Sequence, residues 1–240
     1  MTALLKVSQA TDIGLARKLN EDSILCDVRD VFVVADGMGG HAAGEVASHI
    51  FTATVEKQLL SDDTVLDEGG LRQIFTAGNE AILESIREHP ERSGMGTTAT
   101  MLCIDGKTAY WGHVGDSRLY LLRNGSLEQI TTDHTYVAEL LAAGSISTAE
   151  AMEHPNRNML MRAVGVEENF RVDTGQLDIL SGDMFLLCSD GLTNMVTLAA
   201  IKTILEASDC KDKATALIDV AKAGGGLDNI SAIVVEYYED

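Results

Sequence analysis

Residues 31–41 read VFVVADGMGGH, and this stretch holds the features that decide the fold. An apolar run typical of a buried strand ends at Asp36, and four of the next five residues are Gly or His. Residues 184–191, MFLLCSDG, repeat the arrangement, with Asp190 followed by Gly191. Each stretch therefore predicts a buried strand that ends close to an aspartate. The glycines that follow the aspartate have no side chains, so they leave space around its carboxylate.

Further strand-like segments surround these two. Asn124-Gly125 and Asp105-Gly106 each separate two such segments and are hairpin signals, so we expect antiparallel pairing. The expected strands are short and rich in β-branched or aliphatic residues, and they cover residues 4–9, 23–27, 31–35, 97–104, 108–114, 117–122, 172–178, 184–188 and 230–237.

Helical periodicity is clearest over residues 43–60 and 71–87, where the apolar residues fall on one face. Shorter helices are expected over residues 135–143, 147–153, 197–206 and 212–223. Clusters of strands separated by pairs of helices favour an α+β fold, and we expect one domain over residues 1–240. Within it, residues 144–166 are the least strand-like interior stretch and are expected to form a surface flap.

The charge balance limits the classes of partner. The net charge is 18 − 37 = −19, which disfavours binding to nucleic acid or to an anionic membrane. The four cysteines are widely spaced, no signal-peptide pattern opens the chain, and no stretch approaches the roughly 20 apolar residues of a membrane span. We therefore expect a soluble, cytoplasmic protein with reduced cysteines.

Acidic residues recur beside the apolar runs. Asp36, Asp116, Asp190 and Asp228 each adjoin a Gly or Asn, and the cluster Asn20-Glu21-Asp22 precedes another strand. Gathered together, such carboxylates can hold hard divalent cations, which prefer oxygen ligands. Taken singly, an Asp-Gly pair is more often a turn, and an Asn-Glu-Asp cluster is more often solvated surface. The residues alone leave both interpretations open.

An ordered set of motifs resembles the bacterial metal-dependent Ser/Thr protein phosphatases of the protein phosphatase 2C (PP2C, or PPM) family. The resemblance runs from residue 8 to residue 236. Its motifs are RKLNEDS (17–23), VVADGMGGHAAGEVAS (33–48), GMGTTAT (94–100), HVGDSRLY (113–120), TTDHT (131–135), HPNRNMLMRAVG (154–165), CSDGLTN (188–194) and GGGLDNISAIVV (224–235). It implies a central antiparallel β-sandwich flanked by pairs of helices.

The resemblance also implies a metal site with Mn²⁺ or Mg²⁺. Asp36 would bridge two ions, the Gly37 carbonyl would complete the first, and Asp190 and Asp228 would hold the second. Asp116 would join Asp190 at a third, weaker ion. Two further matches are Asp22, which would orient metal-bound water beside the Glu21 position that varies within the family, and Arg17, which would grip the substrate phosphate.

The implied reaction is hydrolysis of phosphoserine and phosphothreonine in proteins by a metal-activated water, without a covalent enzyme intermediate. Many eukaryotic members have a His directly after the Asp-Gly pair, but here that residue is Met38, so His41 is the substitute candidate for the general acid. His134 and His154 are expected to have structural or flap roles, and Cys188 is expected to be packed in the core.

The implied partners are phosphorylated proteins, including a Ser/Thr kinase and its substrates, and a monomer is expected. A catalytically inactive regulatory relative would have lost ligand residues, and none is lost here. A calcium-binding structural protein would need a D-x-D-x-D-G loop, which the chain lacks.

Overall fold

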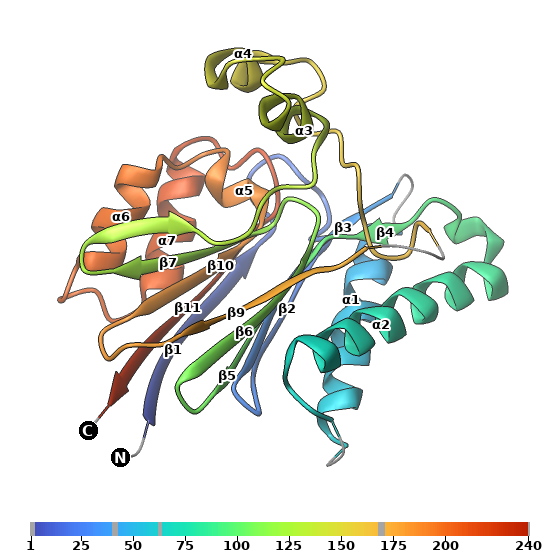
Figure 1. Ribbon diagram of the computed structural model, residues 1–240. Helices are drawn as coiled ribbons and strands as arrows, with labels where there is room; N and C mark the ends of the chain where they lie inside the picture. The colour runs from blue at the N-terminus through green and yellow to red at the C-terminus, as the bar shows by residue number, and fades with distance from the viewer. Residues whose placement is uncertain (1–2, 40–42, 62–63, 168–170, 240) are drawn as a thin grey trace.

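The computed structural model of the protein describes residues 3–39, 43–61, 64–167 and 171–239, and two β-sheets form its centre (Figure 1). The first sheet contains, in spatial order, β1 (Ala3–Asp12), β11 (Ile230–Glu239), β10 (Met184–Cys188), β7 (Arg118–Arg123) and β8 (Ser126–Gln129). The second contains β2 (Asp22–Val28), β3 (Val31–Met38), β5 (Ala99–Asp105), β6 (Thr108–Val114) and β9 (Asp173–Asp178), with β4 (Gly96–Thr97) paired to β3. All of these strand pairs are antiparallel, as the hairpin signals predicted.

The predicted turn at Asn124-Gly125 is confirmed, because both residues have positive φ, 51° and 72°. The hairpin predicted at Asp105-Gly106 also forms, but its turn lies one residue later. Asp105 pairs with Thr108, so the two-residue loop is Gly106-Lys107.

A third hairpin turn, between β2 and β3, had no sequence signal. Arg29 and Asp30 both adopt positive φ there, 54° and 56°, although neither residue is glycine. The Arg29 guanidinium donates to the carbonyl oxygens of Leu59 and Ser61 at 3.3 and 3.1 Å. These tertiary hydrogen bonds help to hold a backbone conformation that the local sequence does not favour.

Strand β3 explains why the opening stretch is continuously apolar. Val31, Val33 and Ala35 are buried in a core cluster with the helices on one side of the strand. Phe32 and Val34 are buried in a second cluster that lies between the two sheets. A strand covered on both faces has no solvent-facing position, so the usual alternation of apolar and polar residues disappears.

Helices cover the outer face of each sheet (Figure 1). Helices α1 (Gly44–Leu59) and α2 (Glu68–Glu88) pack on the second sheet, and α6 (Leu198–Glu206) and α7 (Lys213–Ala223) lie on the side of the first. The short helices η1 (Pro90–Arg92) and α5 (Asp190–Thr193) were not predicted. The α+β sandwich with flanking helix pairs is confirmed.

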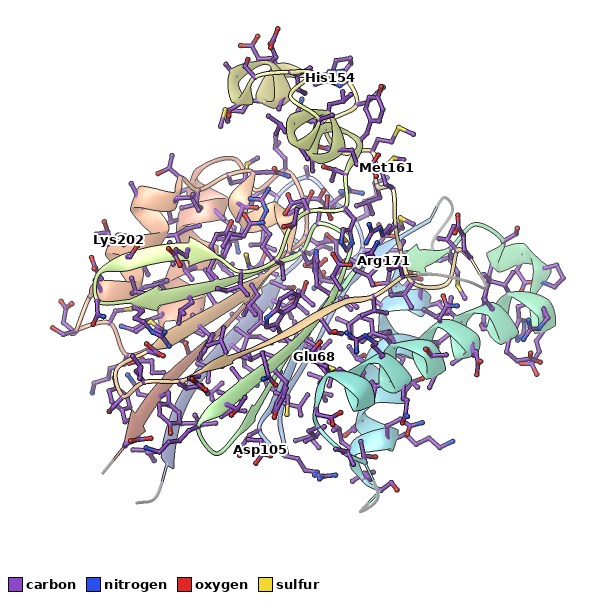
Figure 2. All side chains as sticks on the ribbon, viewed as in Figure 1. Glu68, Asp105, His154, Met161, Arg171 and Lys202 are labelled. Atoms are coloured by element: carbon purple, nitrogen blue, oxygen red, sulfur yellow. The ribbon has the colours of Figure 1, made fainter. Side chains whose placement is uncertain are left out.

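Helices α3 (Tyr136–Ala142) and α4 (Thr148–Glu153) project away from the sandwich (Figure 1). Only Ala151 is buried in either helix, so this excursion, which contains much of the predicted flap, rests on local bonds. Ser147 and Glu150, for example, form a capping box at the start of α4. The chain returns to the sandwich past Met161, as Figure 2 shows.

Two isolated bridges hold the returning segment: Leu160 pairs with Thr135 at the start of α3, and Val164 pairs with Thr97 of β4 in the sandwich. In the part of the chain that the structure describes, no helix is long and apolar enough to cross a membrane.

Candidate active site

The predicted acidic residues converge because their strand ends lie at one end of the sandwich. Asp22 opens β2 and Asp36 lies near the end of β3, and the two residues are direct partners in the antiparallel register. Asp190 follows β10 after one intervening residue, and Asp228 precedes β11. Neighbouring antiparallel strands place the end of one beside the start of the next, so sequence-distant carboxylates become neighbours.

A cavity of about 250 Å³ opens between these strand ends. It is lined by Arg17, Glu21, Asp36, Gly37, Met38, Gly39, Thr98, Asp116, Asn158, Leu160, Asp190 and Asp228. Every described residue predicted for the site therefore lines one cavity, except Asp22, which lies outside its lining. His41 lies outside the described residues.

Two threonines of the neighbouring strand segment hold the backbone at Asp36. The Asp36 N–H donates to Thr98 Oγ1 at 3.0 Å, and the Asp36 carbonyl accepts from the Thr97 hydroxyl at 3.0 Å and the Thr98 N–H at 2.8 Å. These hydrogen bonds leave the carboxylate side chain of Asp36 on the cavity wall.

Glycine is required beside both strand-end aspartates. A Cβ on Gly37 would lie 2.1 Å from the Gly44 carbonyl oxygen, and one on Gly191 would lie 1.9 Å from the Asn229 carbonyl oxygen. Both distances are impossible contacts with backbone atoms. The glycines that follow the strands thus permit close approach of two backbone segments, as their position in the sequence suggested.

Asp22 is held behind the cavity by two serines from the other sheet. Its Oδ2 accepts from the hydroxyls of Ser189 at 2.8 Å and Ser231 at 2.6 Å. Its Oδ1 is buried and has no hydrogen-bond partner among the described residues. Burial raises the pKa of this carboxyl to about 7, since the serine hydrogen bonds only partly offset the loss of water.

The other carboxyls share this electrostatic situation. Burial and repulsion from neighbouring aspartates raise the pKa of Asp36 well above its usual value and that of Asp116 to about 8. Burial, then repulsion from Asp228, also raises the pKa of Asp190. Proton binding or cation binding would relieve the same repulsion, so the site is prepared for positive charge.

The donor set fits hard divalent cations. The cavity offers carboxylate oxygens and a closely approached glycine backbone, and the orphaned Asp22 oxygen lies behind it. No three acidic, His or Cys side chains within the described residues form a closed ligand group. An ion such as Mg²⁺ does not need one, because it keeps several waters and binds one or two carboxylates.

Arg17 contributes a guanidinium group to the lining of this acidic cavity. Its Nη2 donates to Asp228 Oδ2 at 2.8 Å, and its Nη1 lies 3.7 Å from Glu21 Oε2. The Asp228 hydrogen bond raises the pKa of Arg17 further. Because its side chain is 46% exposed, the guanidinium can also reach a ligand in the cavity.

Asn229 is a positioning residue that sequence reasoning missed. Its Oδ1 accepts from the Glu21 N–H at 2.8 Å, and its Nδ2 donates to the carbonyls of Ile13 at 3.0 Å and Leu19 at 2.9 Å. It is 3% exposed and fixes the loop that carries Arg17. The only available signal was its place directly after Asp228.

The remaining sequence candidates lie as expected. Cys188 is fully buried, and burial raises the pKa of its thiol to about 12, which suits packing and not nucleophilic attack. His154 lies on the projecting helices, with its ring 5.8 Å from that of Tyr136 (Figure 2). His134 is buried near the cavity, where its Nδ1 accepts from the Gly115 N–H.

Comparisons with known proteins agree with this geometry. A family model described as protein phosphatase 2C matches residues 17–218. The serine/threonine protein phosphatase PstP of Mycobacterium tuberculosis is 40% identical over 98% of this chain, although the chain spans only 46% of that relative. The serine/threonine phosphatase stp of Listeria welshimeri is 39% identical over 94% of this chain and 93% of its own length. The crystal structure of the PstP catalytic domain with two manganese ions superposes with a TM-score of 0.91 at 37% identity, covering 99% of this chain and all of that one.

Proposed function

The chain belongs to the protein phosphatase 2C family, and on this basis we propose that it hydrolyses phosphoserine and phosphothreonine in proteins with the help of Mn²⁺ or Mg²⁺. The observation that carries the proposal is the cavity itself, in which four aspartates and one exposed arginine meet from distant parts of the chain. Carboxylates suit the cations, and the guanidinium suits the phosphate.

Each residue has a defined task in this proposal. Asp36, the Gly37 carbonyl, Asp190 and Asp228 hold two cations, and Asp116 joins Asp190 at a third. When bound, the cations activate a water molecule as the nucleophile and neutralise the carboxylates. The unpartnered oxygen of Asp22 is suited to accept a hydrogen bond from a water molecule.

Arg17 binds the phosphate and stabilises negative charge on its oxygens. The hydrogen bond to Asp228 and the nearby Glu21 carboxylate orient the guanidinium, and its further N–H groups can donate to phosphate. The leaving alkoxide needs a proton. His41 remains the sequence-based candidate for that donor, and Met38 cannot serve because a thioether has no exchangeable proton.

The proposed substrates are phosphorylated proteins, including a Ser/Thr kinase and that kinase's own substrates, and the proposed active form is a monomer. The homologous phosphatases support the substrate class. We also propose action in the cytoplasm, because Cys103 and Cys188 are buried as thiols, which suits a reducing compartment.

The test is phosphate release from a phosphothreonine peptide. We expect activity to vanish after EDTA treatment and to return when Mn²⁺ or Mg²⁺ is restored. Asp36→Asn should abolish turnover with either metal while the circular dichroism spectrum stays unchanged, because the amide cannot supply a bridging charge.

Two results would contradict the proposal. A folded wild-type protein that is silent with every divalent metal would favour a regulatory binding module. Full activity of Asp36→Asn would remove the metal-bridging role. A matched control is Asp105→Asn, which changes an exposed residue at the end of β5 that does not line the cavity and should keep wild-type activity.

A further inference from the structure

His134 is bonded twice to the turn that carries Asp116. The His134 N–H donates to the Gly115 carbonyl at 2.7 Å, and the Gly115 N–H donates to His134 Nδ1 at 3.1 Å. Gly115 directly precedes Asp116, so this pair of hydrogen bonds ends one residue away from a carboxylate on the cavity wall.

The hydrogen bonds also define the state of the imidazole. A backbone N–H can only donate, so Nδ1 must be an unprotonated acceptor and the ring proton lies on Nε2. Nε2 lies 3.1 Å from Asp173 Oδ2, which accepts that proton's hydrogen bond. Arg162 Nη1 donates to the other oxygen of Asp173 at 3.0 Å and also lies 3.2 Å from His134 Nε2, so a carboxylate and a guanidinium both contact this end of the ring.

The Gly115–Asp116 turn is also restricted by its contact with Thr98. Gly115 has φ of 111°, and a Cβ there would lie 2.6 Å from the Thr98 side chain. The Ser117 and Thr98 hydroxyls are hydrogen bonded at 2.7 Å. One face of the turn thus rests on Thr98, and His134 holds the opposite backbone groups.

His134 is buried, with 6% of its surface exposed, and it does not line the cavity. Its carbonyl accepts from the Met161 N–H at 2.8 Å, which ties the segment returning from α4 to the same residue. The imidazole therefore stands where the returning segment, the start of β9 and the Asp116 turn meet.

We propose that His134 is a positioning residue for the metal site, holding the Gly115–Asp116 turn so that the Asp116 carboxylate stands ready for the most weakly bound cation. The inference rests on the proposed function only in that the cavity binds divalent cations. His134 acts through Asp116 and touches neither substrate nor metal. Residues that orient a ligand in this way are typically worth tenfold to a hundredfold in metal affinity.

The two nitrogens can be separated by substitution. His134→Asn keeps an oxygen acceptor near the place of Nδ1 and loses the contact to Asp173. His134→Gln keeps a polar group near the place of Nε2 and loses the acceptor for the Gly115 N–H. If the hydrogen bond to Gly115 positions Asp116, the Asn variant should retain the Mn²⁺ affinity that the Gln variant loses.

The measurement is Mn²⁺ titration followed by electron paramagnetic resonance, with no substrate present. We expect His134→Gln to weaken the last Mn²⁺-binding step by about tenfold or more and His134→Asn to weaken it by less than about threefold. Asp116→Ala removes the carboxylate itself and so gives the largest expected loss of affinity at this step. Adding His134→Gln to Asp116→Ala should cause no further loss, because the histidine acts only through that carboxylate.

His154→Gln is the matched control. The Asn156 N–H donates to His154 Nδ1 at 3.1 Å, so the control removes the same kind of hydrogen bond from an exposed loop. It should leave Mn²⁺ binding unchanged.

Wild-type affinity in His134→Gln, with the wild type itself binding Mn²⁺, would overturn this inference alone. A wild type that binds no Mn²⁺ would instead overturn the proposed function. If His134→Gln does not fold, His134→Asn alone tests the inference. A loss of Mn²⁺ affinity in His134→Asn as large as that in Asp116→Ala would contradict it, because His134→Asn retains the acceptor for the Gly115 N–H.

Discussion

At the scale of single residues, uncharged side chains hold the charged ones in place. Ser189 and Ser231 bond Asp22, Thr98 bonds the backbone of Asp36, and Asn229 bonds three backbone groups of the loop around Arg17. Ser189 and Asn229 directly adjoin a predicted acidic residue in the sequence, whereas Thr98 and Ser231 do not. Sequence patterns find the carboxylates because acids beside apolar runs are unusual, whereas Ser, Thr and Asn are common in loops and caps.

His113 gives a residue-scale prediction about pH. It is fully buried, its Nδ1 lies 2.9 Å from Thr100 Oγ1, and its ring lies 4.8 Å from that of His134. Burial, followed by the nearby His134, lowers the pKa of His113 to about 3, although Asp173 opposes this. The unfolded chain therefore binds a proton near pH 6.5 that the folded protein does not.

The contribution of neutral His113 to the free energy of unfolding is fully present above pH 6.5. It is lost as the pH falls from 6.5 toward 3, since only the unfolded state gains the proton over that range. Between pH 7.5 and pH 5 this group should cost the wild type about 2 kcal/mol of unfolding free energy. Urea denaturation of the wild type and of His113→Gln at both pH values measures it. The difference in free energy between the two proteins should shrink by that amount at pH 5.

A parallel pH dependence for the wild type and His113→Gln would show that His113 is not held neutral. Titrating groups that do not contact His113, including the cavity carboxyls, are common to both proteins and cancel in the comparison.

At the scale of elements, the projecting helices α3 and α4 differ from the rest of the molecule. They bury almost nothing, and the chain that returns from them contributes Asn158 and Leu160 to the cavity wall. An element that is not needed for the core but adjoins the site can vary without loss of the fold. We therefore expect this flap to select substrates and not to perform the chemistry.

Exchanging residues 144–157 for the corresponding segment of a relative tests this expectation. The exchange leaves Asn158, Leu160 and both isolated bridges intact. The kcat/KM ratio between two phosphothreonine peptides should change by about tenfold, because peptide flanking residues reach the flap. Activity on a small aryl phosphate should stay nearly constant, since that substrate reaches only the cavity. Equal changes on peptide and aryl substrates would contradict a role in selectivity.

At the scale of the whole molecule, the proposed metal site lies between the two sheets. Asp22 and Asp36 come from the second sheet, and Asp190 and Asp228 adjoin strands of the first. Cations bound between them should therefore stabilise the complete sandwich. Without cations, the mutual repulsion of buried carboxyls works against the fold.

Thermal unfolding should show this linkage. At a Mn²⁺ concentration one hundred times Kd, one site adds about 2.7 kcal/mol, which raises Tm by about 5–10 °C for a chain of this length. Asp36→Asn should reverse the order, with a Tm above the wild type in EDTA and below it in Mn²⁺, because it removes both a repelling charge and a ligand. Differential scanning calorimetry measures both. An Asp36→Asn protein with the wild-type Mn²⁺ shift would contradict the linkage.

The sequence by itself determined the α+β class, most of the strands and helices, and the acidic residues that line the cavity. Elements α5, β8 and η1 lay outside the predicted ranges, and β4 and β5 were predicted as one strand over residues 97–104. It could do so because these features depend on local patterns, namely the apolar runs of β3 and β10, the helical periodicity of α1 and α2, and the Asp-Gly pairs. The ordered motifs identified the family for the same reason.

Only the tertiary structure decided which groups support the carboxylates and where the turns between strands fall. Asp22 meets Ser189 and Ser231 across more than 160 residues of chain, and the Arg29-Asp30 turn is held by the carbonyls of Leu59, the last residue of α1, and of Ser61. Such contacts arise from the packing of one sheet against the other and of helix against sheet. They leave no periodic or local signature in the sequence, because common polar residues become specific only when folding brings their partners to them.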